Sequence, residues 1–266
     1  MKSASRLHAR DFISRSAASG RYHFNSSDAQ DALGVSAAAT KLALHRLSKQ
    51  GLIASPARGF YVIVPPEYQS LGSLPAEQFI PALMERLGQP YYAGLLSAAQ
   101  FHGAAHHRPQ EFQVMVARAR RPIVCGVVRV GFVVRKKIAS VATQSFNTPR
   151  GTVLVSTPEA TAIDLVGYHD HVGGFDQVAT ILGELVDSID PEKLVAAAET
   201  APVPWAQRLG YLMDQAGADD RTGPLKAYVR KHARSTAVLL PAASQQDAVR
   251  DDGWRLSINV TVESEL

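Results

Sequence analysis

The chain has 266 residues, which is enough for two domains of ordinary size, so a single small module is excluded. Hydrophobic residues make up 46% of it and charged residues 20%, as in a soluble globular protein, and no apolar run approaches the roughly 20 residues of a membrane helix. The N-terminus lacks the apolar segment of a secretory signal, so we expect a cytoplasmic protein with no membrane partner. Cys125 is the only cysteine, which excludes an intrachain disulfide and a cysteine-rich zinc site.

The net charge of +4 is unevenly distributed along the chain. Residues 1–64 hold nine Lys or Arg and three Asp or Glu, and residues 65–160 hold ten and five, whereas residues 161–266 hold nine and sixteen. A basic N-terminal side favours nucleic acid as a partner there, and the acidic C-terminal side indicates a different partner or none.

The first 50 residues predict a series of short helices. Apolar residues at helical intervals predict a first helix that ends at Gly20. Residues 22–24 can form a short strand, and residues 26–33 a short helix with acidic residues in its first turn. A tight turn then leads to a longer helix over residues 37–49, which Ser36 is suited to cap.

A β-hairpin is predicted after the longer helix. Two apolar runs flank the Pro/Gly turn SPARG, which carries Arg58 near its tip. This order of elements is that of a winged helix-turn-helix, in which the second paired helix lies in the DNA major groove and the hairpin, or wing, reaches a flanking phosphate backbone. We therefore predict a winged helix-turn-helix DNA-binding domain over residues 1–66 and a second domain over residues 67–266.

The outer face of helix 37–49 supplies the predicted contacts to double-stranded operator DNA. Its inward positions are Thr40, Ala43, Leu44 and Leu47, at spacings of three and four. Small residues at the start of the helix allow a close approach to the groove floor. The residues expected to neutralise phosphates are Lys41, Arg46, Lys49 and Arg58, and the candidates to reach base edges are Ser36, Lys41 and His45, so the role of Lys41 stays open between the two. The predicted DNA-binding residues are Ser36, Ala38, Lys41, His45, Arg46, Lys49 and Arg58. The alternative use of such a module, docking to a protein, stays open.

The rest of the chain predicts a domain of mixed α and β structure, which makes the whole protein α+β. Two helices are expected over residues 76–88 and 91–103, followed by Val/Ile/Phe-rich strands between Glu111 and Val155. From Thr157 the pattern turns helical again, and a closing strand is expected over residues 254–262. The predicted helices of this part cover residues 158–167, 175–189, 191–199, 204–217 and 223–233.

Four sequence runs that follow the winged helix carry a family resemblance. These runs are YYAGLLSAAQFHG, STPEATAIDLV, GGFDQVATILGEL and WAQRLGYLMDQAG. In this order they resemble the AbiEi antitoxins of bacterial type IV toxin-antitoxin (abortive infection) systems, over nearly the whole chain. The resemblance implies a winged helix that binds promoter repeats and represses its own operon. It also implies a second domain that counters a nucleotidyltransferase-type toxin, AbiEii, without a stable complex.

The family motifs fall on residues that helix capping, charge pairing and packing explain. They are Ser97, Ala98, His102 and Gly103, then Thr157, Pro158, Glu159 and Asp164, then Arg208, Leu209, Gly210 and Tyr211. No catalytic residue and no cofactor is predicted, and the chain is expected not to be an enzyme. The polar segment 234–253 matches no motif.

A second group of basic residues lies in the strand-rich region. It consists of Arg118, Arg120, Arg121, Arg129, Arg135, Lys136 and Lys137. Strand alternation is expected to place Arg118 and Arg120 on one face. This additional basic surface could extend the DNA footprint, bind RNA or a nucleotide-bound toxin, or remain an inert solvated face.

Two other functional classes stay open. A ligand-responsive winged-helix regulator would carry an apolar pocket with converging polar groups in the second domain. A nucleic-acid-processing enzyme would need clustered carboxylates or histidines around a divalent ion. Histidines 102 and 106 are four residues apart, but Gly103 is expected to end the helix between them, so no metal site is predicted.

Overall fold

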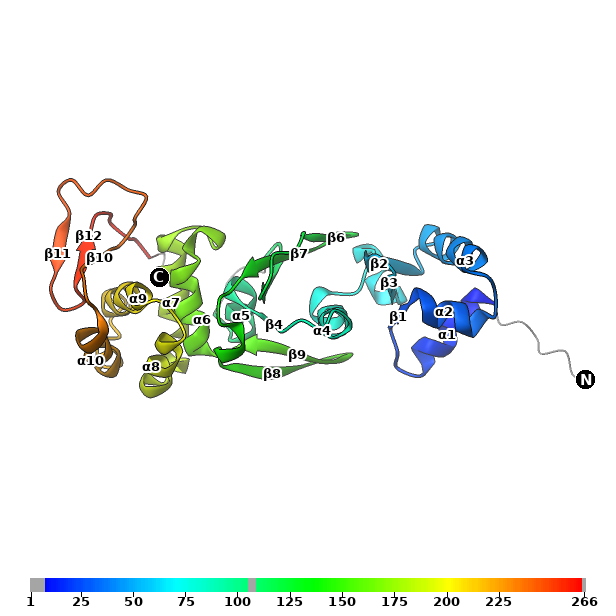
Figure 1. Cartoon of the computed structure of the whole chain (residues 1–266), viewed down its shortest axis with the longest axis horizontal. Coiled ribbons are helices and arrows are strands. Elements are labelled where there is room, and N and C mark those ends of the chain that lie inside the picture. The colour runs from blue at the N-terminus through cyan, green and yellow to red at the C-terminus, as the bar shows by residue number, and fades with distance from the viewer. Residues whose placement is uncertain (1–7, 105–108, 265–266) are drawn as a thin grey trace, which may run out of the picture.

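The computed structural model describes residues 8–104 and 109–264. Its elements follow one long axis (Figure 1), with a helical unit and a three-stranded sheet at one end, a six-stranded sheet in the middle, and a group of helices at the other end. Within these residues no helix is both long and apolar enough to cross a membrane. The α+β class predicted from the sequence is confirmed.

The N-terminal unit has the element order of a winged helix-turn-helix. Its elements are α1 (Ala9–Ala18), β1 (His23–Asn25), α2 (Ser26–Leu33), α3 (Ala37–Lys49), β2 (Ile53–Ala57) and β3 (Phe60–Ile63). Strands β1 and β2 both pair antiparallel with β3. The helices pack on this small sheet through a cluster that includes Phe12, Phe24, Leu33 and Leu44. The predicted winged helix is therefore confirmed.

Helix α3 has the bounds that the sequence predicts. The Ser36 Oγ accepts a hydrogen bond from the backbone N–H of Ala39 (3.3 Å) and so caps the helix. Thr40, Leu44 and Leu47 are buried, at the spacing that places them on one side of a helix. The opposite side of α3 is left for other contacts.

A mixed six-stranded sheet forms the middle of the molecule. It is preceded by a 3-10 turn, η1 (Pro66–Leu71), and by α4 (Ala76–Arg86), and its strand order is β6-β7-β5-β4-β9-β8. The strands and the intervening helix are β4 (Tyr91–Ala93), α5 (Leu95–Phe101), β5 (Phe112–Val116), β6 (Ile123–Cys125), β7 (Val128–Val134), β8 (Thr143–Thr148) and β9 (Gly151–Ser156). The pairs β5/β7 and β4/β9 are parallel, and the others are antiparallel.

The single helix predicted over residues 91–103 is wrong in its first part. Strand β4 occupies Tyr91–Ala93, and α5 begins only at Leu95, after Gly94. The strand lies between β5 and β9, whose backbones both offer it hydrogen bonds. A strand of three residues is too short to show a period of two in the sequence, so its helical neighbour dominated the prediction.

The sequence also misses the edge strand β8. All six of its side chains are exposed or half-buried, and Phe146 is the one large apolar residue in the run TQSFNT, so the sequence shows no apolar alternation there. Pairing with β9 across the whole length of β8 places it at the end of the sheet. The hairpin is therefore set by the apolar β9 and by the turn that joins the two strands.

The wing strand β3 is buried on both of its faces. Phe60, Val62 and Val64 pack into a cluster with α4 and the central sheet, whereas Tyr61 and Ile63 pack into the N-terminal cluster. Because successive side chains of a strand point to opposite faces, one strand contributes to two cores. The winged helix is therefore held against the central sheet through its wing.

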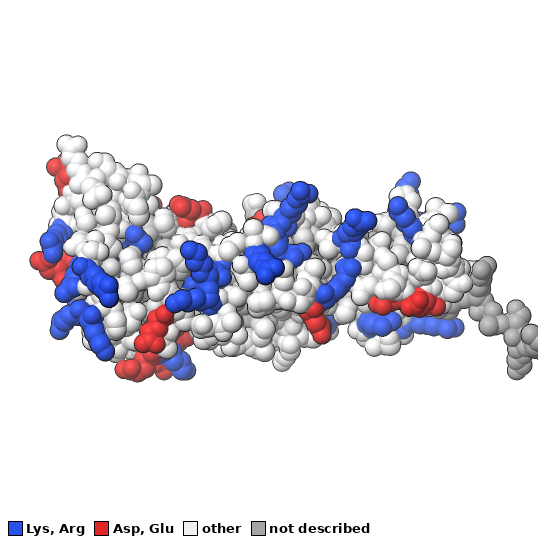
Figure 2. All heavy atoms as spheres, in the orientation of Figure 1, with Lys and Arg blue, Asp and Glu red and all other residues white. Residues whose placement is uncertain are grey.

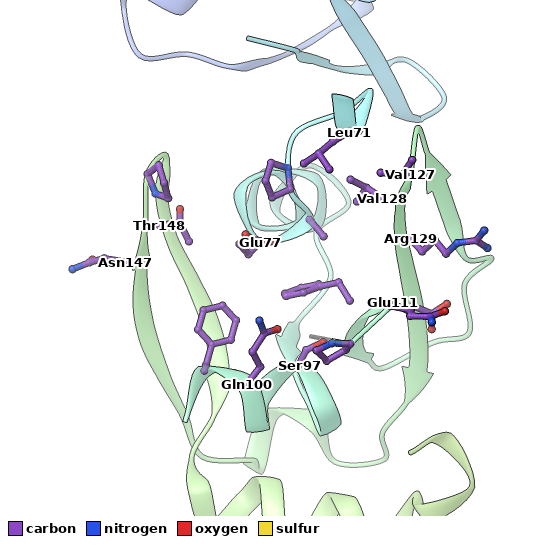
Figure 3. A pocket seen from close by; sticks show the side chains of 17 residues that line it. Leu71, Glu77, Ser97, Gln100, Glu111, Val127, Val128, Arg129, Asn147 and Thr148 are labelled. Carbon is purple, nitrogen blue, oxygen red and sulfur yellow. The ribbon is translucent and has the colours of Figure 1, made fainter. Parts of the chain in front are cut away.

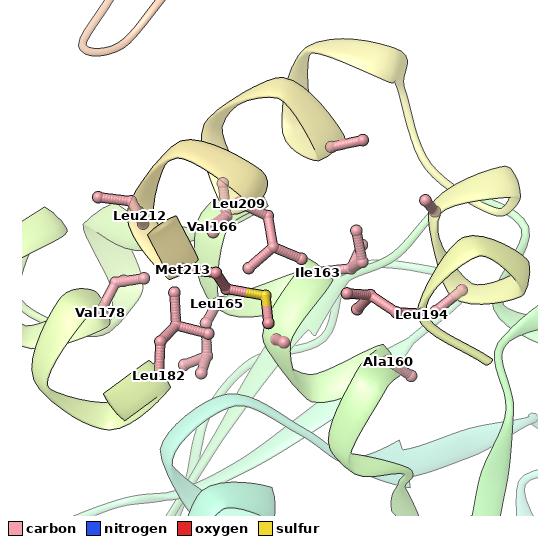
Figure 4. Packing of buried hydrophobic residues seen from close by; sticks show 14 of the residues in the cluster. Ala160, Ile163, Leu165, Val166, Val178, Leu182, Leu194, Leu209, Leu212 and Met213 are labelled. Atoms are coloured by element: carbon pink, nitrogen blue, oxygen red, sulfur yellow. The ribbon is translucent and has the colours of Figure 1, made fainter. Parts of the chain in front are cut away.

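Five α-helices and a small three-stranded sheet follow within the described residues 157–264. They are α6 (Pro158–Gly167), α7 (Phe175–Leu185), α8 (Pro191–Glu199), α9 (Val203–Gln215), α10 (Gly223–His232), β10 (Ala237–Val238), β11 (Val249–Asp251) and β12 (Leu256–Ile258). Helix α6 is buried from Glu159 to Val166 and packs against α5, α7, α8 and α9. Ile163, Leu182, Leu194 and Leu209 meet in this core (Figure 4).

The polar segment 234–253 contains β10 and β11 and leads to a buried tryptophan. Trp254 is 1% exposed, and its indole N–H donates to Asp214 (2.7 Å). Its ring lies directly against Gly210 on α9, where no side chain would fit. The segment therefore carries the Trp254 side chain onto the helical core, next to the Arg-Leu-Gly-Tyr motif.

We expect Gly210→Ala to lower the free energy of unfolding by roughly 1–3 kcal/mol, because the new methyl group would overlap the Trp254 ring. Urea unfolding followed by circular dichroism measures this loss. Gly223→Ala is the matched control, since no atom lies within 4 Å of the added carbon. Equal midpoints for the two variants would contradict the close packing of Trp254 on Gly210.

Candidate nucleic-acid interface

The exposed face of α3 contains small, apolar, polar and basic side chains and no acidic one. Its exposed members are Ser36 at the N-cap and Ala37, Ala38, Ala39, Lys41, Leu42, His45, Arg46, Ser48 and Lys49. The structure thus brings together on one surface all of the predicted DNA-binding residues except Arg58. Whether they bind DNA stays a prediction.

Sequence reasoning missed Leu42. This side chain is 50% exposed and lies on the outer face of α3, four residues after Ala38 and three before His45. That spacing places the three side chains on one side of a helix, opposite the buried Thr40 and Leu47. The same spacing rule that selected Ala38 and His45 would have found Leu42.

Arg58 lies at the tip of a short wing that contacts α4. Its side chain is exposed, and its backbone carbonyl oxygen accepts a hydrogen bond from Arg86 Nη1 (3.3 Å). The Arg86 guanidinium also lies over the Phe60 ring, 5.9 Å from its centroid. The wing tip therefore contacts the central part of the molecule. At this contact Arg86 of α4 lies beside Arg58.

The basic residues of the strand-rich region do not form one strip. Arg118, Arg120 and Arg121 lie in the loop between β5 and β6, so the strand alternation expected for Arg118 and Arg120 is wrong. Arg120 is half-buried, donates to Gln89 Oε1 (3.3 Å) and lies over the Phe132 ring. The exposed members of the group are Arg118, Arg121, Arg129, Lys136 and Lys137. Figure 2 shows basic side chains over the winged helix, over the junction beside it and over the sheet.

Arg135 is not a surface residue, and its placement on the basic surface is wrong. It is 3% exposed, and its Nε donates to Asp164 Oδ1 at 2.8 Å. Asp164 also accepts a hydrogen bond from the Tyr92 hydroxyl group (2.6 Å). The Arg135 guanidinium donates further to Thr200 and lies 5.2 Å from the centroid of the Trp205 ring. Burial raises the pKa of the Asp164 carboxyl group, and the ion pair with Arg135 and the hydrogen bond from Tyr92 oppose that effect.

The other residues of the family motifs also serve the fold. Thr157 Oγ1 caps α6, Ser97 Oγ accepts from the Gln113 N–H (2.8 Å), and Glu159 Oε1 accepts from the Asp190 N–H (3.0 Å). Arg208 Nε donates to the Val238 carbonyl oxygen (2.9 Å). These contacts join α5 to β5, α6 to the start of α8 and α9 to β10.

The histidines make local contacts. Burial lowers the pKa of His102, which favours a neutral ring whose Nε2–H donates to the Ser156 carbonyl oxygen (2.7 Å) and whose Nδ1 accepts from Gln144 (3.3 Å). The ring of His169 stacks on Phe175. Residue 106, the other half of the spacing considered for a metal site, lies outside the described residues. Among residues 8–104 and 109–264, no group of three His, Cys, Asp or Glu side chains could hold a metal ion.

A cavity of about 510 Å³ lies between η1, α4, α5 and strands β5, β7 and β8. Its lining combines apolar side chains such as Phe101 and Phe112 with polar ones such as Glu77 and Gln100. Arg129 points away from its centre (Figure 3). Its walls expose nearly as much polar as apolar surface, so it has the concave shape of a small-molecule site but not the mainly apolar lining that is typical of one.

Comparison with known proteins assigns both parts of the chain to one family. A profile described as "Transcriptional regulator, AbiEi antitoxin" matches residues 11–64, and one described as "AbiEi antitoxin C-terminal domain" matches residues 92–215. The chain belongs to the AbiEi antitoxin family. No curated protein matches this AbiEi chain significantly.

Solved structures include one with the same fold as this AbiEi chain. The RV2827C protein from Mycobacterium tuberculosis is 18% identical, with a TM-score of 0.67 over 97% of this chain and 91% of that one. At this identity the likeness shows the fold alone. An antigenic nucleotidyltransferase-like protein from Paracoccidioides brasiliensis is 11% identical over 57% of this chain and 91% of that one, with a TM-score of 0.34, which does not indicate a shared fold.

We expect Arg135→Met to lower the free energy of unfolding by about 3–5 kcal/mol, because the carboxyl group of Asp164 stays buried without its ion pair. Urea unfolding measures the loss, and the double variant Arg135→Met, Asp164→Leu should recover part of it. In the control Arg250→Met the broken ion pair with Asp252 is exposed, and little change is expected. A loss in Arg135→Met no larger than in the control would contradict the structural role of the pair.

Proposed function

We propose that this AbiEi chain is a repressor that inserts α3 into the major groove of operator DNA. The observation that supports this most is the composition of the uncovered face of α3, where small and basic side chains gather and acidic ones are missing. Small residues at the start of the helix permit close approach to the base pairs. The exposed Lys41, Arg46 and Lys49 suit contacts to phosphates, and Ser36 and His45 can reach base edges.

The docking of the wing supports a footprint that continues beyond the winged helix. Arg58 and Arg86 lie together at the junction, and Arg118 and Arg121 occupy an exposed loop of the central sheet. Because β3 packs into two cores, it joins the elements that carry these arginines to the winged helix that contains α3. We propose that the exposed members of the basic group provide additional phosphate contacts.

The match of residues 92–215 to the antitoxin profile supports a second activity. We propose that this part counteracts a nucleotidyltransferase-type toxin encoded beside it, as the family resemblance implies. The full-length triple variant Lys41→Ala, Arg46→Ala, Lys49→Ala separates the two activities. Rescue of toxin-expressing cells should persist in this variant, because the changes lie outside the matched region, and loss of rescue in a folded variant would contradict the assignment.

A ligand-responsive regulator is a second candidate function, which the cavity between α4 and the sheet favours. In that case a small molecule would bind there and change the affinity of α3 for DNA. A metabolite screen by thermal shift, followed by DNA binding with and without each hit, would discriminate this candidate. A repressor without an effector would show no compound that alters DNA affinity.

We expect the same triple variant of Lys41, Arg46 and Lys49 to weaken binding to a duplex of the DNA upstream of the gene and to a scrambled duplex alike. The slope of log K against log salt concentration should fall by about 0.9 for each phosphate contact that is lost. Mobility shifts at several salt concentrations measure both effects.

The matched control removes the same number of basic side chains at the far end of the molecule, on and after α10. Its substitutions are Arg230→Ala, Lys231→Ala and Arg234→Ala. This control should keep the wild-type affinity and slope. If the wild type binds both duplexes equally and the α3 variant matches it, the assignment of α3 as the DNA reader is wrong.

A further inference from the structure

The centre of the exposed face of α3 is occupied by an apolar side chain. Leu42 is 50% exposed, and no other large hydrophobic side chain within the described residues 8–64 is as exposed. At 3.6 residues per turn, Ala38, Leu42, His45 and Lys49 form a line directly opposite the buried side of the helix. Whatever α3 binds therefore meets Leu42 near the middle of the contact.

Leu42 has no large apolar neighbour on the exposed side of its own helix. The turn before it carries the small Ala38 and Ala39, and its other neighbours at helical spacing are His45 and Arg46. A leucine side chain cannot form a hydrogen bond to a phosphate or a base edge. The phosphate contacts proposed for its basic neighbours therefore do not explain why a leucine is exposed at this position. A partner that uses this whole face must offer an apolar group between its anionic ones.

The DNA major groove offers one apolar group, the C5-methyl group of thymine. Phosphates flank the groove, so Lys41 and Arg46 on the two sides of the face, with Lys49 at the end of the helix and an apolar side chain at the centre, match the chemistry of the groove. We propose that Leu42, with Ala38 beside it, is a specificity-determining residue that contacts thymine methyl groups. This inference rests on the proposed insertion of α3 into the major groove, and it names the base that the helix prefers.

Replacement of thymine by uracil tests the proposal, since uracil pairs in the same way but lacks the methyl group. Binding sites are first enriched from a random duplex library with the full-length protein and are then resynthesised with uracil at single thymine positions. With the wild type, uracil at one or a few positions should weaken binding about fourfold, the effect of removing one buried methyl-sized group. With Leu42→Ala the difference between thymine and uracil should vanish at those positions.

The matched control is Val249→Ala, which shortens an aliphatic side chain that is 66% exposed in the C-terminal sheet. It should keep the wild-type pattern of uracil sensitivity. Thermal melting of Leu42→Ala should match that of the wild type, because the side chain packs little in the fold.

The outcomes separate this inference from the proposed function. Enrichment of a sequence whose binding is indifferent to uracil, or equally sensitive in Leu42→Ala and the wild type, overturns the role of Leu42 and leaves the DNA reader in place. Failure to enrich any sequence overturns sequence reading by α3 and the inference with it. If Leu42→Ala abolishes self-association in size-exclusion chromatography without altering the uracil pattern, the leucine serves a protein contact and the inference is wrong.

Discussion

The burial of β3 on both faces is the constraint on which the arrangement of the molecule depends. Phe60, Val62 and Val64 belong to one core, and Ile63 belongs to the other. In a free-standing winged helix the outer side of the wing would face water, and apolar residues would alternate with polar residues along the strand. Here the run FYVIV is apolar throughout, which is typical of a strand covered on both sides. Rotation of the proposed DNA-reading helix against the central sheet would therefore expose the apolar side chains of β3 to water.

Local signals in the sequence were sufficient for much of the N-terminal unit. The Ser36 cap and the spacing of Thr40, Leu44 and Leu47 gave the bounds and the buried side of α3. Likewise, Thr157 marked the start of α6. Strands β4 and β8 were missed because their strand conformation depends on neighbours that are distant in the sequence. The strand propensity of a segment contains no information on which other strands will form hydrogen bonds with it.

In the candidate site, too, local sequence patterns predict some residues correctly and residues that depend on distant contacts wrongly. The basic residues of α3 are exposed as predicted, because a helical period states which side faces the core. Arg135, Lys136 and Lys137 are three consecutive basic residues, and nothing in this run of the sequence indicates that Arg135 is buried. Its partner Asp164 comes 29 residues later, within a helix whose own burial only the fold reveals. Charge counts measure composition, whereas exposure follows from packing.

The long axis of the molecule separates its two ends (Figure 1). The winged helix occupies one end, and the C-terminal helices, with much of the antitoxin-profile match, occupy the other. A duplex held at the first end leaves the second end projecting as an arm, open to other molecules. In the proposed function, the DNA contacts would gather at the winged helix and the neighbouring edge of the central sheet, and the C-terminal helices would stay accessible to a second partner while DNA is bound.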